Sequence, residues 1–168
     1  MSISTPIPLK FLLHPVHFLS LGFGSGMSPK APGTFGTLAA LVAFVIAHNI
    51  FGPIPWEPYL IVLSVSGLLG VYLCGKTASD LGVHDHGGIV WDEFVGFWLC
   101  LFLVPVTWFW LVTAFVLFRI FDIFKPWPIK WIDQKVSGGL GIMLDDILAG
   151  AYVLAILHLL KLFLPEFS

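Results

Sequence analysis

The chain has 168 residues, of which 58% are hydrophobic and only 11% are charged. A soluble domain carries about 25% charged residues, and a body of this size cannot bury so much apolar surface away from water. The composition therefore predicts an integral membrane protein. The net charge of −2 and the absence of any basic tract exclude binding to nucleic acid by charge.

No linker, internal repeat or low-complexity segment divides the sequence, so we expect a single domain over residues 1–168. The N-terminal segment has no small-residue cleavage site, and a cleaved signal peptide is therefore not expected. Residues 10–20 are apolar but too few to span a bilayer, which indicates a surface or interfacial helix. Cys74 and Cys100 lie in apolar runs without the spacing of a zinc site, so we interpret both as core residues.

Residues 22–37, GFGSGMSPKAPGTFGT, contain five glycines and two prolines. Such a segment disfavours a helix and leaves backbone N–H groups free to face an anion. A plain flexible loop is the commoner meaning of glycine-rich sequence, and the order of a Walker loop is absent. However, Thr34 to Thr37 lead directly into an apolar run, and helix N-termini bind phosphate.

Five apolar runs predict five membrane-spanning helices. They cover residues 34–51, 59–77, 89–104, 108–124 and 147–164. Prolines or a Gly-Pro pair end the first, third and fourth runs, because proline cannot continue a helix. The predicted fold class is all-α, a polytopic membrane helix bundle with an additional interfacial helix at the N-terminus.

The charges fall unevenly on the two sides of this predicted bundle. With a cytoplasmic N-terminus, every basic residue except Lys161 lies on the cytoplasmic side, as the positive-inside rule requires. Every acidic residue except Glu57 and Glu166 lies on the same side. Acidic residues follow no such rule, so their gathering at one membrane face needs another cause.

Two acidic pairs border apolar runs. Asp92 and Glu93 stand at the start of the third run, and Asp145 and Asp146 directly precede the fifth. An ionised carboxylate near hydrocarbon costs about 2.5–3.5 kcal/mol on insertion scales, so such residues usually face a polar cavity or a cation. Capping of a helix N-terminus is the simpler alternative, but a cap explains one acidic residue at each place rather than two.

Further polar residues occur at the same membrane face. Arg119, Asp122 and Lys125 are spaced three apart on one helix, where they either form a polar site or only stabilise the helix by ion pairs. His84 and His86 flank an aspartate, and the residues leave open whether they transfer protons or are ordinary loop residues.

Five carboxylates at one face would repel each other unless a cation neutralised them, and oxygen ligands suit Mg²⁺ rather than zinc. They are Asp92, Glu93, Asp122, Asp145 and Asp146. Lys30, Arg119, Lys125 and the amides of residues 33–37 supply groups that hold phosphate. The residues therefore indicate a metal-dependent, phosphate-handling membrane enzyme at the cytoplasmic interface, and they leave hydrolysis and transfer both open.

Four motifs carry a specific resemblance. They are GFGSGMSPKAPGTFGT (22–37), HDHGGIVWDEFVG (84–96), FRIFDIFKPWPIK (118–130) and GGLGIMLDDILAG (138–150). In this order and spacing they resemble the bacterial phosphatidylglycerophosphatase A family. The resemblance implies a Mg²⁺-dependent phosphatase of the bacterial inner membrane that converts phosphatidylglycerophosphate, a lipid substrate, to phosphatidylglycerol.

The resemblance fits the roles that the residues indicate, and together they give a mechanistic hypothesis for individual residues. The metal ligands would be Asp92, Glu93, Asp145 and Asp146, with Asp122 as a fifth. The phosphate-binding residues would be Lys30, Gly33, Thr34, Thr37, Arg119 and Lys125. Catalytic roles are expected for Asp85, His84 and His86 in proton transfer and for Asp92 and Asp122. Attack on phosphorus by a metal-activated water and a route through an aspartyl-phosphate both remain open.

Two other function classes are alternatives. A transporter also places acidic residues in a membrane, but it predicts charges near the midplane and related halves, whereas here the charges gather at one edge. A non-catalytic membrane scaffold gives no reason for the acidic pairs. The sequence does not fix the oligomeric state.

Overall fold

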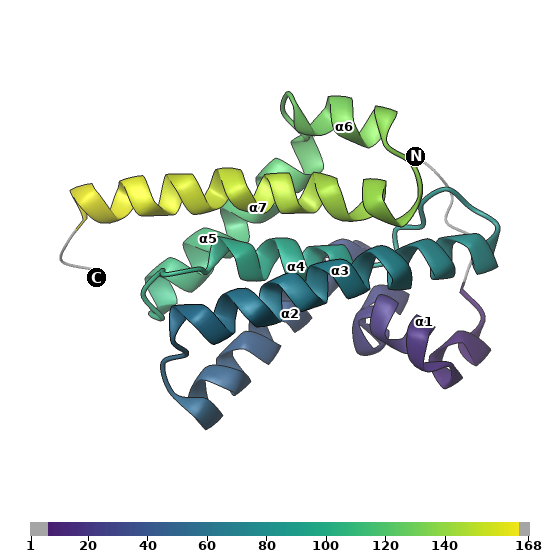
Figure 1. The fold of residues 1–168 in the computed structure, drawn as a ribbon, viewed down its shortest axis with the longest axis horizontal. Helices are drawn as coiled ribbons and strands as arrows, with labels where there is room; N and C mark the ends of the chain where they lie inside the picture. Colours follow the sequence, from purple (N-terminus) through teal and green to yellow (C-terminus); the bar gives the residue numbers. More distant parts are fainter. Residues whose placement is uncertain (1–6, 165–168) are drawn as a thin grey trace.

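The computed structural model describes residues 7–164, and within that range it is entirely helical (Figure 1). The predicted all-α class is therefore confirmed. Glu166, one of the residues used for the predicted orientation, lies outside the described residues. The elements are η1 (Leu9–Leu13), α1 (Pro15–Ser20), η2 (Gly22–Met27), α2 (Pro32–Phe51), α3 (Trp56–Leu81), α4 (Trp91–Cys100), α5 (Trp108–Phe124), α6 (Ile129–Lys135) and α7 (Gly138–Phe163).

Three helices of the described chain, α2, α3 and α7, are long and apolar enough to cross a membrane. They contain 20, 26 and 26 residues. Helix α5 has 17 residues and rises about 25 Å at about 1.5 Å per residue, whereas the ten residues of α4 rise only about 15 Å. The predicted count of five spans is therefore not confirmed.

Helix α4 is the most deeply buried element and is shorter than the predicted helix over 89–104. It packs mainly on α7, α2 and α3. The chain leaves the helix after Cys100, and Leu103 has a left-handed φ of 57°. Leu101 and Val104 are nevertheless buried. The prediction was too long because this buried turn is as apolar as the helix before it.

Helix α7 begins at Gly138, nine residues before the predicted start at 147, so the acidic pair Asp145 and Asp146 lies inside the helix rather than ahead of it. The interpretation of this pair as a border of the last helix was therefore wrong. The reason is tertiary packing. A Cβ on Gly139 would collide with the carbonyl of Val71 and stand 2.7 Å from the amide nitrogen of Gly75 on α3.

Substitution of Gly139 by Ala is expected to destabilise the protein by about 1–3 kcal/mol, because the two helix backbones must separate. Gly67→Ala on α3 is the matched control, since its Cβ would meet Val95 Cγ1 at an ordinary 3.8 Å. Alanine favours a helix over glycine, so this control should keep or raise the unfolding midpoint measured in detergent. Equal midpoints for the two variants would contradict the close crossing of α3 and α7.

The N-terminal segment forms η1 and α1 rather than one helix over residues 10–20. Helix α1 lies at the end of the bundle where α3 ends and α7 begins (Figure 1). It is attached to α3 by His17, whose Nδ1 lies 2.9 Å from Thr77 Oγ1 and whose Nε2 lies 3.2 Å from Asp80 Oδ2. The amide of Val90 donates to the carbonyl of Ser20 at 2.9 Å, so this segment also fixes the start of α4.

Aromatic side chains fill the space around α4. Phe94 and Phe97 are fully buried, and Trp98 Nε1 donates to the carbonyl of Ala40 on α2 at 3.0 Å. Both cysteines, Cys74 and Cys100, are buried and free, as predicted for core residues. The core therefore holds the first turn of α4, which carries Asp92 and Glu93, in a fixed place.

Candidate active site

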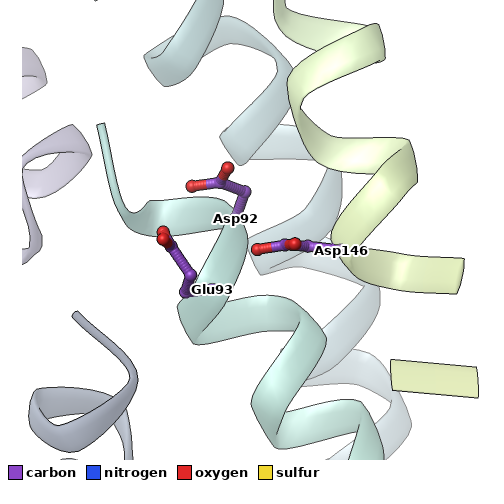
Figure 2. A group of neighbouring side chains, drawn as sticks. All are labelled: Asp92, Glu93 and Asp146. Atoms are coloured by element: carbon purple, nitrogen blue, oxygen red, sulfur yellow. The ribbon is translucent and has the colours of Figure 1, made fainter. Parts of the chain in front are cut away.

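Three carboxylates from two helices meet at the start of α4. Asp92 and Glu93 of α4 and Asp146 of α7 each offer an oxygen, and these oxygens all lie within 4.8 Å of one another (Figure 2). The helices come this close because they cross at glycines. A Cβ on Gly96 would stand 2.6 Å from the carbonyl of Asp146, and one on Gly150 would collide with the carbonyl of Gly96.

The simple helix cap does not describe this cluster. The N-cap residue of α4 is Val90, and no side chain makes a capping hydrogen bond there. Asp92 and Glu93 are instead the second and third residues of the helix. They gain from the helix dipole, but their oxygens point to the space they share with Asp146 (Figure 2).

The cluster fits a divalent cation. Asp92 Oδ1, Glu93 Oε2 and Asp146 Oδ2 are buried and have no hydrogen-bond partner within residues 7–164. Buried carboxylate oxygens without partners are costly unless a cation compensates them. The cluster offers only oxygen donors, which suit Mg²⁺ and other hard cations.

Arg119 on α5 connects the cluster to its neighbours. Its Nη1 lies 2.6 Å from Asp122 Oδ2, donates to Thr37 Oγ1 at 3.3 Å and lies 3.8 Å from Glu93 Oε1. A Cβ on Gly33 would collide with Glu93 Oε1 and stand 3.1 Å from Arg119 Nη2. The guanidinium thus lies between α2, α4 and α5, directly beside Gly33 at the start of α2.

Lys125, which ends α5 in a left-handed conformation with φ 42°, forms the second ionic group. Its Nζ lies 2.7 Å from Asp133 Oδ1 and 2.5 Å from Asp145 Oδ2. Burial lowers the pKa of Lys125, but the two carboxylates outweigh burial and raise this pKa above its ordinary value. The ammonium group therefore stays charged and holds Asp145 away from the three-carboxylate cluster.

The phosphatidylglycerophosphatase A family model matches residues 18–161 of this chain. Phosphatidylglycerophosphatase A of Escherichia coli K12 is 50% identical over 146 residues, which cover 86% of this chain and 83% of that protein. The chain belongs to the phosphatidylglycerophosphatase A family. Phosphatidylglycerophosphatase A of Haemophilus influenzae is 46% identical over 162 residues, covering 96% and 98% of the two chains. The resemblance seen in the four motifs is confirmed, and the chain is a lipid phosphatase by family.

A third relative, from Bacteroides thetaiotaomicron, is 39% identical over 139 residues, covering 80% of this chain and 86% of that protein. Its name assigns it provisionally to the phosphatidylinositol-3-phosphatases. No solved structure matches the chain. None of these similarities supports the transporter alternative.

Three of the five predicted metal ligands, Asp92, Glu93 and Asp146, form the cluster. The other two, Asp122 and Asp145, lie beside it. Asp122 pairs with Arg119, whose Nη1 lies 2.6 Å from Asp122 Oδ2. Asp145 pairs with Lys125, and its Oδ1 accepts the amide N–H of Asp146 at 3.0 Å. The predicted set is thus gathered in one place but divided between a cluster and two ion pairs.

The predicted phosphate-binding segment at the start of α2 is more helical than its sequence indicates. Pro32 has no N–H, and the amides of Thr34 and Phe35 donate to the carbonyl of Ala31 at 2.9 and 3.2 Å. The expectation that the amides of residues 33–37 are free for an anion is therefore wrong at residues 34 and 35. The helix starts earlier than predicted because Pro32, whose fixed φ suits the first position of a helix, begins it directly after Ala31.

The side chains of this segment divide into two groups. Thr37 is fully buried, and its hydroxyl donates to the carbonyl of Gly33 at 2.9 Å while accepting from Arg119. Thr37 therefore positions Arg119. Lys30 lies exposed in the turn before α2, and Thr34 is half-buried in the first turn.

The loop between α3 and α4 carries the predicted proton-transfer residues. His84 and Asp85 are exposed. His86 is buried, its Nδ1 accepts the amide N–H of Gly88 at 3.0 Å, and its carbonyl accepts that of Ile89 at 2.7 Å. His86 thus shapes the turn that leads into α4, while the proton-transfer roles stay predictions.

Sequence reasoning missed Asp133, which pairs with Lys125 across the turn after α5. Lys125 and Asp133 are eight residues apart and separated by two prolines, so no helical periodicity in the sequence connects them. It also gave no role to Gly96 and Gly150, although both lie inside the motifs, at their last positions.

Proposed function

We propose that this chain hydrolyses the phosphate monoester of phosphatidylglycerophosphate to phosphatidylglycerol and inorganic phosphate. The reaction uses Mg²⁺ at the cytoplasmic face of the bacterial inner membrane. The observation that carries this proposal is the cluster of Asp92, Glu93 and Asp146, with unpartnered buried oxygens beside Arg119. The names of the relatives from Escherichia coli and Haemophilus influenzae supply the lipid substrate.

The cytoplasmic position is supported by the distribution of charge. Lys76, Lys125 and Lys130 belong to the end of the bundle where α3 and α5 end and α6 begins. Positive charge gathers on the cytoplasmic side of membrane proteins. The N-terminus is accordingly placed in the cytoplasm.

The proposed topology keeps five crossings. A pocket at the far end of the bundle is lined by Pro53 and Ile54 of the α2–α3 turn together with Leu103 and Val104 of the α4–α5 turn. Both turns therefore reach the same depth. Helix α4 followed by its apolar turn, and then α5, are assigned as the third and fourth crossings.

The chain's own residues supply binding and orientation. When bound, Mg²⁺ supplies polarisation of a phosphoryl oxygen and lowers the pKa of water. Arg119 Nη1 is engaged by Asp122 and Thr37, whereas its buried Nε has no partner within residues 7–164. Arg119 therefore binds the phosphate through the donors of its guanidinium that Asp122 and Thr37 do not occupy. A planar guanidinium held by a carboxylate is suited to this task. Lys125 pairs with Asp133 and Asp145 and thereby holds these two carboxylates in place.

The leaving alkoxide of the lipid needs a proton. His84 and Asp85 lie exposed on the loop that precedes α4, so they can exchange protons with water. We assign proton transfer to this loop. Asp92 and Asp122 flank the reacting phosphate in this proposal, Asp92 within the cluster and Asp122 through Arg119.

Removal of divalent cations tests the proposal. Purified protein in detergent is expected to release phosphate from phosphatidylglycerophosphate with Mg²⁺ and to stop in excess chelator. Mg²⁺ should also raise the unfolding midpoint, because a ligand at about 100 times its Kd stabilises by about 2.7 kcal/mol. Full release in chelator would refute the metal role. Faster phosphate release from phosphatidylinositol 3-phosphate than from phosphatidylglycerophosphate would show that the preferred substrate carries an inositol headgroup.

A further inference from the structure

An apolar groove of about 480 Å³ lies between α3, α4 and α7. Its volume is within the range of about 300–1,000 Å³ that ligand sites occupy. Apart from Ser64, the lining side chains that the structure describes are apolar. Leu68 on its rim is 77% exposed, so the groove opens sideways, toward the surroundings of the spanning helices.

The groove exists because α3 and α7 are in contact at one level and apart at another. At Gly75 and Gly139 their backbones touch. About two turns earlier in α3, at Gly67, a Cβ would meet only Val95 Cγ1 of α4, at 3.8 Å. Helix α4 therefore forms the floor of the groove, while α3 and α7 form its walls.

The groove is continuous with the carboxylate cluster. On α4, Leu99 lines the groove and follows Asp92 by seven residues, which places both on one stripe of the helix. On α7, Met143 lines the groove and precedes Asp146 by three residues, which places both on one side of that helix. From Asp92 to Leu99 the helix rises about 10 Å. The groove thus starts beside the cluster and runs along α4 away from it.

Two further pockets of the described chain lack this continuity. They are lined by Phe44, Ile54 and Tyr59. Phe44 follows Gly33, which lies beside the cluster, by eleven residues of α2. The two residues are therefore about 16 Å apart along the helix. A lipid phosphate at the cluster could not begin its chain there.

We infer that the groove between α3, α4 and α7 holds one fatty acyl chain of the phospholipid whose phosphate lies at the cluster. This inference rests on the proposed function and names a second contact of the same substrate. The phosphate must reach Asp92 and Asp146 while the chains remain in hydrocarbon, and this groove connects the two environments. Because lipid is as apolar as the groove, the contact orients the substrate rather than adding affinity.

Filling the groove tests the inference. Gly67→Phe is expected to lower kcat/KM for long-chain phosphatidylglycerophosphate about tenfold or more, because a small misplacement of a reacting group costs up to about 100-fold. Hydrolysis of the deacylated headgroup, which has no chain to place, should be unchanged. Gly67→Ala, and Val42→Phe on the exposed face of α2, should resemble the wild type with both substrates.

The outcomes separate the inference from the proposed function. If the wild type releases no phosphate from either substrate, the proposed function fails. If it does and Gly67→Phe affects both substrates equally or neither, the groove does not hold the chain.

Photolabelling of the wild-type protein provides a measurement that does not depend on a folded variant. Phosphatidylglycerophosphate with a diazirine on one acyl chain should label peptides of residues 63–71 and 140–147 several-fold more than phosphatidylcholine with the same chain. Equal labelling by the two lipids would mean that bulk lipid fills the groove. Labelling confined to other helices, or cross-links between two copies at this face, would overturn the inference as well.

Discussion

Replacement of Asp146 by Asn is expected to lower phosphate release at least about 100-fold, since loss of a group that merely orients a metal ligand already costs about 10–100-fold. Asn keeps the shape of the side chain and removes one charge from three carboxylates whose oxygens lie within 4.8 Å of each other. The same change relieves repulsion in the metal-free protein. Without Mg²⁺ the variant should therefore be at least as stable as the wild type, and Mg²⁺ should no longer raise its unfolding midpoint.

Two matched variants make this prediction specific. Asp145→Asn alters the neighbouring residue, which pairs with Lys125, and should leave the Mg²⁺ concentration for half-maximal activity near the wild-type value. Asp80→Asn removes a carboxylate that pairs with Lys76 at the end of α3 and should retain activity. An Asp146→Asn protein with an unchanged Mg²⁺ requirement would show that the cluster is not the metal site.

Arg119 is the second position with a large expected effect. Arg119→Met should abolish activity and destabilise the protein by about 1–3 kcal/mol, because it leaves the partly buried carboxylate of Asp122 without its partner. Arg119→Lys keeps the charge but not the planar fork that reaches Asp122 and Thr37 together. We expect it to lose at least about tenfold in kcat/KM, since this exchange is not conservative at such a site.

A double variant separates the structural role of Arg119 from its role in binding phosphate. Arg119→Met combined with Asp122→Asn removes both charges, so the unfolding midpoint in detergent should recover most of the loss. Activity should stay absent. Recovery of activity along with stability would show that Arg119 serves only to neutralise Asp122.

Helices limited by prolines in the sequence were predictable, whereas helix boundaries that depend on packing against other helices were not. Helix α5 covers Trp108–Phe124 as predicted, because Pro105 and Pro126 limit it on both sides. The start of α7 at Gly138 was missed because a glycine-rich run resembles a loop. Its helical state depends on contact with Val71 and Gly75, far away in sequence.

The candidate site was predictable in composition but not in pairing. Unpaired acidic residues beside apolar runs are costly, so the sequence could identify all five carboxylates. Their partners depend on helix rotation. Asp145 and Asp146 are neighbours in a helix, about 100° apart around its axis, and they therefore reach different groups. One pairs with Lys125 and the other joins Asp92 and Glu93.

The crossing of α4 and α7 at Gly96 and Gly150 has a consequence for the proposed metal site. At this crossing backbone meets backbone, so no side-chain rotamer can adjust the distance between the helix that carries Asp92 and the helix that carries Asp146. Mg²⁺ requires oxygens at about 2.0–2.1 Å, whereas Ca²⁺ takes them at about 2.3–2.6 Å in flexible arrangements. If Mg²⁺ occupies the cluster as proposed, two glycines without side chains therefore fix the spacing of the two helices that supply its ligands.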